Sequence, residues 1–337
     1  MKRWQQITNV PTMTQGVPEY FGEDARILRK VIRSMEDCLE DMGFDQLMSG
    51  PLVSHQIFLN NLEYLGKRFM DNLVYSQVNG ENGSSVLLPE GTMKSYDFIR
   101  RSEMKKAKVF YSAFFTRNED PVDVSKGKTR CFWQIGFEIF NHPIFQSSIE
   151  AINATYSLLI SAGLDDAYIR ITDKRILKGL IESYSEKDRE IIMSIIDKAD
   201  DSSSKFRELY SVSGGESKSV VEDITELLEM ISVPNQDILS KLKGVVKKSK
   251  QSQEGIDNIS RIQEKLGNNV TMKIIPFMAK SWDACDKLMF DGRYPGYDSA
   301  ICGGGNLTYN GYRPDSPKSG VGVGVTRVFD IIKSKMF

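Results

Sequence analysis

Gln134 and Glu138 are a polar pair within a run of mostly aromatic and β-branched residues in the stretch 107–141. Residues an even number apart in a strand point to the same face. The run therefore predicts a strand on which glutamine and glutamate flank the side-chain-free Gly136. Such a surface suits a bound ligand, because glycine allows close approach and the polar groups fix orientation. A hairpin with one solvated face explains the periodicity equally well.

The residues before this run predict a partner strand that carries a charged loop. Val109, Tyr111, Ala113 and Phe115 alternate with their neighbours, as in a strand with one buried face. The connection of roughly thirteen residues is longer than a hairpin needs, and long loops are often functional. Its charged residues are Arg117, Glu119, Asp120, Asp123, Lys126, Lys128 and Arg130.

The element Pro89-Glu90-Gly91-Thr92 lies between a predicted strand and a predicted helix. Thr92 is of the residue type that caps helix N-termini, so we expect it to be the N-cap. Glu90 could receive the ammonium group of a ligand. A solvated turn residue is the more common role for such a glutamate.

Glycine and valine alternate from Gly320 to Val325, and Thr326 and Arg327 follow before an apolar helix expected from Val328 to Met336. One face of this strand would carry no side chains, so a flat ligand could lie there beside Arg327. Tight packing of the strand against the helix explains the glycines as well.

The elements that must position these residues follow from apolar periodicity and turn residues. The predicted helices span 23–43, 93–103, 145–162 and a segment beginning at Asp173. The predicted strands span 44–48, 73–78, 85–88, 167–171, 272–277, 288–291, 298–302 and 320–327. From residue 182 to 266, charge and serine increase and helical periods dominate, so we expect a helical insertion between core segments 1–181 and 267–337. A lysine cluster within it, at 241–250, favours a solvated helix face over a polyanion site.

Composition excludes several classes of protein. The net charge of -1 over 337 residues provides no global attraction for nucleic acid or anionic membranes. No apolar run approaches the roughly 20 residues that span a bilayer, and the segment Met1–Gln6 lacks an apolar signal core. Four cysteines without paired spacing and only two histidines argue against a zinc site and favour a reducing, cytoplasmic setting.

In order along the chain, these stretches resemble class II aminoacyl-tRNA synthetases, and within them the histidyl-tRNA synthetase group. GKTRCFWQIGFEIF, at the end of 107–141, is similar to the second signature of that class, and VGVGVTRVFDII to the third. Residues 41–52 resemble the first signature, which builds the dimer interface, and LLPEGT resembles the histidyl-type Pro-Glu-Gly-Thr element. ITDKRIL resembles the segment before the insertion of the family. The resemblance implies an α+β fold: an antiparallel sheet flanked by helices, with a helical insertion, in a homodimer.

The resemblance also implies ATP and Mg²⁺ as cofactors and assigns roles to residues. Arg117 would bind the α-phosphate as a catalytic residue, and Arg327 would clamp the γ-phosphate side; a forked, permanently charged guanidinium suits both tasks. Glu119 and Arg130 would complete the ATP site, with Glu119 holding adenine. The implied amino-acid-binding residues are Glu90, Thr92, Gln134, Glu138, Asp283 and Cys285. No protein side chain is assigned to a metal.

Two family elements are altered. The Arg-Gly-Leu-Asp-Tyr-Tyr element aligns with Lys280–Cys285, so the catalytic arginine becomes Lys280 and both tyrosines are absent. Lysine keeps the charge and loses the bidentate fork. The Gly-Gly-Arg-Tyr-Asp element appears as Gly304–Thr308. These changes predict a pocket that is larger than, or different in shape from, one made for histidine.

Three functions fit these observations, in order of preference. The first is activation of an amino acid, or a related carboxylate, as an adenylate; the acceptor would be tRNA, a protein or a small molecule. The second is the non-catalytic regulatory subunit of ATP phosphoribosyltransferase in histidine biosynthesis, whose partner is the catalytic subunit. The third is the catalytic part of a histidyl-tRNA synthetase. The chain stops at Phe337, before the further domain of roughly 100 residues that would bind the anticodon.

Overall fold

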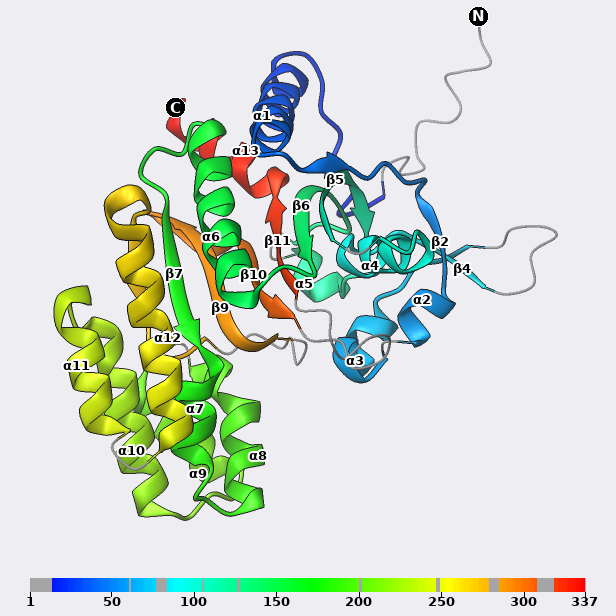
Figure 1. Ribbon diagram of the computed structural model, residues 1–337. Coiled ribbons are helices and arrows are strands. Elements are labelled where there is room, and N and C mark those ends of the chain that lie inside the picture. The colour runs from blue at the N-terminus through cyan, green and yellow to red at the C-terminus, as the bar shows by residue number, and fades with distance from the viewer. Residues whose placement is uncertain are drawn as a thin grey trace, which may run out of the picture.

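The computed structural model describes residues 14–60, 62–76, 84–104, 106–125, 128–199, 202–246, 249–278, 285–307 and 318–336. Within these ranges the central feature is a sheet of eight strands in the order β1-β5-β6-β11-β10-β9-β7-β8 (Figure 1). Neighbours run antiparallel except the two outermost pairs, β1·β5 and β7·β8. The strands are β1 (Asp45–Gln46), β5 (Ala107–Thr116), β6 (Cys131–Phe140), β7 (Tyr168–Asp173), β8 (Met272–Ile274), β9 (Cys285–Tyr294), β10 (Tyr297–Leu307) and β11 (Lys318–Gly324). The expected α+β architecture is confirmed.

Three helices cover one face of the sheet: α1 (Glu23–Asp41), α6 (Ile144–Ser161) and α13 (Val325–Lys335). Alternate residues of the central strands, such as Ile135, Phe137, Val321 and Val323, join the apolar sides of these helices in one buried core. Since side chains alternate along each strand, the other set of β6 and β11 residues must face away from these helices.

The opposite face carries a smaller layer. It contains α4 (Thr92–Arg101), the short helices α2 (Gln56–Leu59) and α3 (Leu62–Asp71), and a sheet of β2 (Leu52–Ser54), β4 (Ser85–Leu87) and β3 (Tyr75–Ser76). A second apolar core joins α4 to the sheet through Met93, Tyr96, Val109, Tyr111 and Phe140. The polar side chains of β6, Gln134 and Glu138, face this layer.

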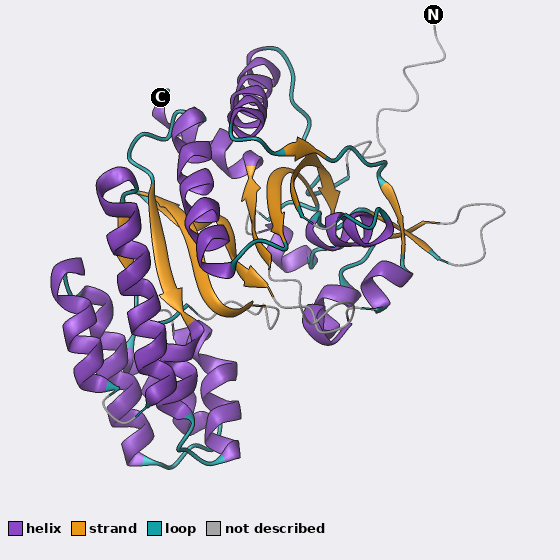
Figure 2. Ribbon diagram, viewed as in Figure 1, coloured by secondary structure: helices purple, strands orange, loops and turns teal. Residues whose placement is uncertain are grey.

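The segment after β7 is helical, as expected (Figure 2). Asp173 caps α7 (Lys174–Ile181) by accepting a hydrogen bond from the backbone N–H of Arg175 at 3.1 Å. The later helices are α8 (Glu186–Ile195), α9 (Ser203–Val212), α10 (Lys218–Glu229), α11 (Asn235–Val245) and α12 (Lys250–Leu266). Their buried residues form one continuous core with β7 and α6, and the division into core segments and insertion stays a prediction. Two residues of the lysine cluster, 247 and 248, lie outside the described residues.

Several boundaries differ from the expected ones. β9 and β10 are longer than predicted and pair with each other around Gly296, which adopts a positive φ of 78° that suits glycine. β8 is shorter than predicted, and the short helix α5 (Pro121–Ser125) lies inside the charged loop between β5 and β6. In the part of the chain described, the helices are too short or too polar to cross a membrane.

Candidate active site

The strand register brings the predicted polar residues to one face of the sheet. Tyr111 on β5 lies opposite Gly136 on β6, which in turn lies opposite Gly322 on β11. Gln134 and Glu138 flank this row on the same face, opposite the one that α1, α6 and α13 cover. The predicted arrangement of the glutamine and the glutamate around Gly136 is therefore present.

Glu138 lies at the buried end of this face, with no exposed side-chain surface. Its Oε1 accepts a hydrogen bond of 2.6 Å from the Thr92 hydroxyl, and its Oε2 lies 3.3 Å from Nζ of Lys318. Burial raises the pKa of Glu138, and the charge of Lys318 and the hydrogen bond from Thr92 act against this rise. Glu138 is thus held between a helix start and a neighbouring strand.

Glu90 caps the N-terminus of α4. Its two carboxylate oxygens each accept a 2.7 Å hydrogen bond, from the backbone N–H groups of Thr92 and Met93. The prediction that Thr92 is the N-cap is wrong, because Thr92 is the first helical residue and its hydroxyl points to Glu138 instead. Burial raises the pKa of Glu90 to about 7, despite these hydrogen bonds and the nearby charge of Lys318. Glu90 is buried, not a solvated turn residue.

The glycines of β11 make room for the polar side chains of β6. A Cβ added at Gly320 would lie 1.9 Å from Oε2 of Glu138, and one added at Gly322 would lie 2.6 Å from Nε2 of Gln134. Neither expected reason for these glycines, a flat ligand or packing of the strand on a helix, accounts for these two contacts. Because β11 has no side chain at Gly320 or Gly322, the side chains of Gln134 and Glu138 can lie over it.

Tyr111 completes the polar surface, although its sequence context indicated only a buried strand residue. Its hydroxyl accepts a 3.4 Å hydrogen bond from Nε2 of Gln134. The ring fits because Gly91 and Gly136 carry no side chains; an added Cβ at either would lie 2.3 Å from a Tyr111 atom. Burial, together with the charges of Glu138 and Glu90, holds the pKa of Tyr111 well above its usual value.

Arg117 and Arg327 lie at the same edge of the sheet. Arg117 follows β5, Arg327 lies in the first turn of α13 after β11, and the register pairs Thr116 with Cys131 and Gly324 with Gln134. Burial lowers the pKa of Arg117, the charges of Glu90 and Glu119 act against this, and the positive charge of Arg327 is a smaller lowering cause. Arg327 is therefore close enough to Arg117 for its charge to be felt there.

Each guanidinium is held in place by a carbonyl oxygen. Arg117 donates from Nε to the carbonyl oxygen of Pro89 at 2.9 Å and lies over the Phe132 ring, 5.1 Å from its centroid. Arg327 donates from Nη1 to the carbonyl oxygen of Ala300, and its side chain is exposed. Only part of each donor fork is occupied by these bonds.

Glu119 and Arg130 belong to the loop that leads into β6. Arg130 donates from Nε to the carbonyl oxygen of Glu119 at 3.3 Å and from Nη1 to that of Gln15 at 3.0 Å. The Glu119 carboxylate lies 3.4 Å from Nζ of Lys128. In this arrangement Arg130 anchors its own loop, and its contact with ATP stays a prediction.

The remaining predicted residues divide into two sets. Lys280 and Asp283 lie outside the described residues. Cys285 is buried at the start of β9, near enough to Lys318 to affect its pKa, which burial lowers. Lys318 was not predicted from the sequence. It could have been found from its position two residues before Gly320, because residues two apart in a strand share a face.

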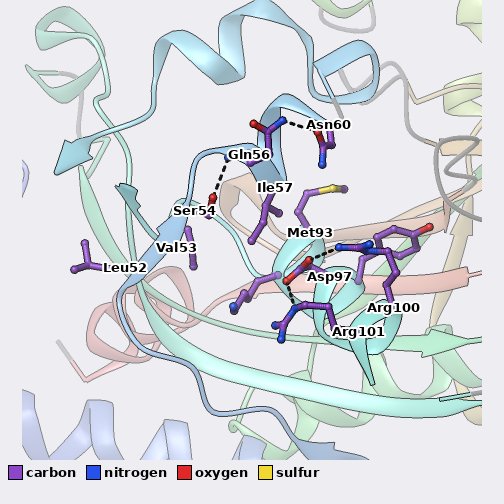
Figure 3. A pocket seen from close by; sticks show the side chains of 12 residues that line it. Leu52, Val53, Ser54, Gln56, Ile57, Asn60, Met93, Asp97, Arg100 and Arg101 are labelled. Carbon is purple, nitrogen blue, oxygen red and sulfur yellow. Dashed lines mark hydrogen bonds and ion pairs between the residues drawn. The ribbon is translucent and has the colours of Figure 1, made fainter. Parts of the chain in front are cut away.

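A further groove of about 360 Å³ lies between α2, β2 and α4 (Figure 3). The Asp97 carboxylate accepts from Arg101 at 2.9 Å and from Arg100 at 3.3 Å along its wall. None of the predicted site residues lines this groove. Met93 and Tyr96, which belong to the core between α4 and the sheet, contribute to its lining.

The chemistry of the residues at this end of the sheet suits a nucleoside triphosphate. Two guanidinium groups can match the charge of phosphate oxygens, and the glycine backbone at 322 and 324 is partly exposed on the same strand. The described residues hold no group of three or more His, Cys, Asp or Glu side chains placed to bind a metal ion. Mg²⁺ often binds through phosphate oxygens and few carboxylates, so Mg²⁺ would be carried by the nucleotide.

Comparisons with known proteins agree with this fold. Over 336 residues the chain is 26% identical to a histidine--tRNA ligase of Pyrococcus horikoshii, covering 95% of this chain and 75% of the relative. It is 24% identical to the histidine--tRNA ligase of Methanocaldococcus jannaschii over 323 residues, 93% of this chain and 74% of that one.

Solved structures show the same fold at lower identity. A Bacillus halodurans protein described as an ATP phosphoribosyltransferase regulatory subunit/histidyl-tRNA synthetase superposes with a TM-score of 0.81 at 13% identity, over 96% of this chain and 83% of that one. A histidine--tRNA ligase subunit of Alicyclobacillus acidocaldarius gives a TM-score of 0.75 at 13% identity, over 97% and 99%. The family model for histidyl-tRNA synthetase matches residues 16–326. The chain therefore belongs to the histidyl-tRNA synthetase family.

Proposed function

We propose that this protein activates an amino acid with ATP, forming an aminoacyl-adenylate and pyrophosphate. The observation that carries the proposal is the placement of Arg117 and Arg327. Far apart in the sequence, they lie at one end of the central strands of the sheet. Two guanidinium groups at one end of the sheet suit a ligand with several phosphate groups.

In this reaction the substrate carboxylate attacks the α-phosphorus of ATP, the bond from the α-phosphorus to the bridging oxygen breaks, and pyrophosphate leaves. Negative charge accumulates on the phosphate oxygens in the transition state. Arg117 would stabilise that charge at the α-phosphate and Arg327 would hold the pyrophosphate end. The protein supplies positioning and electrostatic stabilisation and forms no covalent bond.

The amino acid would bind on the polar surface next to the arginines. Glu90 and Thr92 would meet the α-ammonium group, and Gln134 and Glu138 would orient the amino acid. Arg117 bonds to the carbonyl oxygen of Pro89, the residue before Glu90, so the phosphate and ammonium sites are direct neighbours. A substrate carboxylate would then lie between them.

ATP–pyrophosphate exchange, screened over the amino acids with Mg²⁺ present, tests the proposal. We expect exchange with at least one amino acid, lost in Arg327→Ala and kept in Arg207→Ala, a change at an exposed arginine on α9. Absence of exchange with every amino acid, in protein that binds ATP and is folded by circular dichroism, would refute it.

Regulation of an ATP phosphoribosyltransferase is the second candidate function. The Bacillus halodurans structure, whose description includes that role, supports it. In a pull-down, this protein would then bind a purified ATP phosphoribosyltransferase catalytic subunit. The activity of that catalytic subunit in the complex would change when histidine is added. The third candidate, the catalytic part of a histidyl-tRNA synthetase, rests on the named relatives, and histidine-dependent exchange would distinguish it.

A homodimer and a tRNA acceptor are further proposals. Met48, within the segment that resembles the first signature, is 83% exposed, and Phe21, just before α1, is 94% exposed. A second copy of the chain could cover such residues.

One face of α1 carries four exposed basic residues around a groove of about 430 Å³: Arg26, Arg29, Lys30 and Arg33. Salt-dependent binding of tRNA that weakens in Arg29→Ala would support that face as its site.

A further inference from the structure

Lys318 is the buried cation of the polar surface. It begins β11, opposite Phe140 on β6 and Leu307 on β10, and its side chain is 1% exposed. Lysine is almost never fully buried unless it is paired. Its burial beside the proposed amino-acid site therefore calls for a role.

The surroundings of the Lys318 ammonium are those of a cation-binding pocket. Nζ lies 3.3 Å from Oε2 of Glu138, 5.1 Å from the Phe140 ring centroid and 5.8 Å from that of Tyr96. A carboxylate and two aromatic rings are groups that bind a ligand ammonium or imidazolium. In this protein the cation among these groups is the ammonium of Lys318.

Glu138 already has a cation beside it. Lys318 provides a buried positive charge 3.3 Å from the Glu138 carboxylate, and Arg117 provides another positive charge near Glu90. A basic side chain of a ligand directed toward Glu138 would add a second cation beside Lys318 in a buried position, which is costly.

The geometry also limits the length of the ligand. Glu138 and Lys318 are inaccessible, whereas Gln134 and Gly322 are partly exposed, so a ligand enters from the Gln134 end. Glu138 fills the space over Gly320, where even a methyl group would lie 1.9 Å from its Oε2. A side chain directed toward Glu138 therefore meets an occupied site.

We propose that Lys318 is a specificity-determining residue: it occupies the side-chain end of the amino-acid pocket as a built-in counter-cation of Glu138, so the site takes a small uncharged amino acid and excludes histidine, lysine and arginine. This inference rests on the proposed function for the identity of the ligand as an amino acid. The substrate class is that of glycine, alanine and serine.

Amino-acid binding is measured by thermal shift and calorimetry without ATP, for the wild type and two variants. Lys318→Met keeps the length of the side chain and removes its charge. The double variant Lys318→Met/Glu138→Gln also removes the carboxylate, so no unpaired buried charge is left to prevent folding. We expect the wild type to bind glycine, alanine or serine at least tenfold more tightly than histidine or lysine. Lys318→Met should gain at least tenfold in affinity for histidine or lysine, and the double variant should lose that gain.

Three results overturn the inference: tighter binding of histidine than of small amino acids by the wild type, an unchanged preference in Lys318→Met, or binding of no amino acid by any of the three proteins. ATP binding and pyrophosphate exchange are measured separately. Failure of exchange alone, with the Lys318-dependent preference intact, counts against adenylation and leaves the role of Lys318 standing.

Discussion

The Thr92 hydroxyl donates a 2.6 Å hydrogen bond to Oε1 of Glu138, joining the first residue of α4 to the middle of the central sheet. Both side chains are buried. The contact lets one backbone turn, capped by Glu90, set the position of the carboxylate that faces Lys318.

Replacing Thr92 by valine tests this connection. Valine keeps the shape and removes the donor, leaving Glu138 Oε1 buried without its hydrogen bond, at a cost of about 1–3 kcal/mol. Urea unfolding should show this loss. Thr271→Val is the matched control: its hydroxyl bonds to Tyr156 at 3.1 Å in an exposed position, and a surface change should stay within about 0.5 kcal/mol. Equal effects of both changes would contradict a special role for Thr92.

Glu90 should make stability depend on pH. Its pKa in the folded protein is raised to about 7, against about 4.3 for glutamate in an unfolded chain. Between about pH 4 and pH 7 the folded protein holds a proton that the unfolded chain has released, so the free energy of unfolding falls as pH rises through this window, by roughly 3 kcal/mol in total.

Urea unfolding across that range measures the fall. In Glu90→Gln the slope should flatten, since the titrating group is gone, whereas exposed Glu226→Gln should keep the wild-type slope. A wild-type free energy of unfolding that rises steadily from about pH 5 to pH 7 would mean that Glu90 does not titrate as described.

Gly320→Ala should damage the site through crowding. The new methyl group would meet Glu138 Oε2 and the carbonyl oxygen of Phe137, at 1.9 Å and 2.9 Å, and overpacking of this kind costs about 1–3 kcal/mol. Gly244→Ala is the opposite case, because nothing lies within 4 Å of a Cβ there and the residue is in α11. It should gain about 0.5–1 kcal/mol. Thermal unfolding of the two variants side by side gives the comparison.

Arg117→Lys and Arg327→Lys test whether forked donors are required. Lysine keeps the charge but cannot contact two phosphate oxygens with one planar group. Loss of a transition-state donor lowers the rate by roughly 10²–10³-fold, and we expect a drop of that order in kcat for exchange with Arg117→Lys. For Arg327→Lys the main effect should be on the KM for ATP. Arg207→Lys, on the surface of α9, should match the wild type.

Local patterns were enough to predict most of the elements. Alternation in 107–115 and 131–140 predicted β5 and β6, and the face shared by Gln134 and Glu138 followed from strand geometry alone. The helix expected from Asp173 begins at Lys174 in the structure, with Asp173 as its N-cap.

Contacts between distant segments could not be predicted in this way. Glu138 and Lys318 meet only because β6 and β11 are neighbours in a particular register, which no periodicity specifies. The N-cap was assigned to Thr92 because threonine caps helices often. The structure assigns that task to Glu90, since the Thr92 hydroxyl has a partner on a distant strand.

The segment before α1 has a consequence for how the protein is handled. The Gly16 carbonyl oxygen accepts from the backbone N–H of Arg130 at 2.6 Å and of Cys131 at 3.2 Å, beside the bond from Arg130 to Gln15. The residues before α1 thus hold the loop that carries Glu119 in place through backbone hydrogen bonds. Trimming the amino terminus past Gly16, or joining a tag there, would remove the hydrogen bonds that hold that loop while leaving the sheet whole.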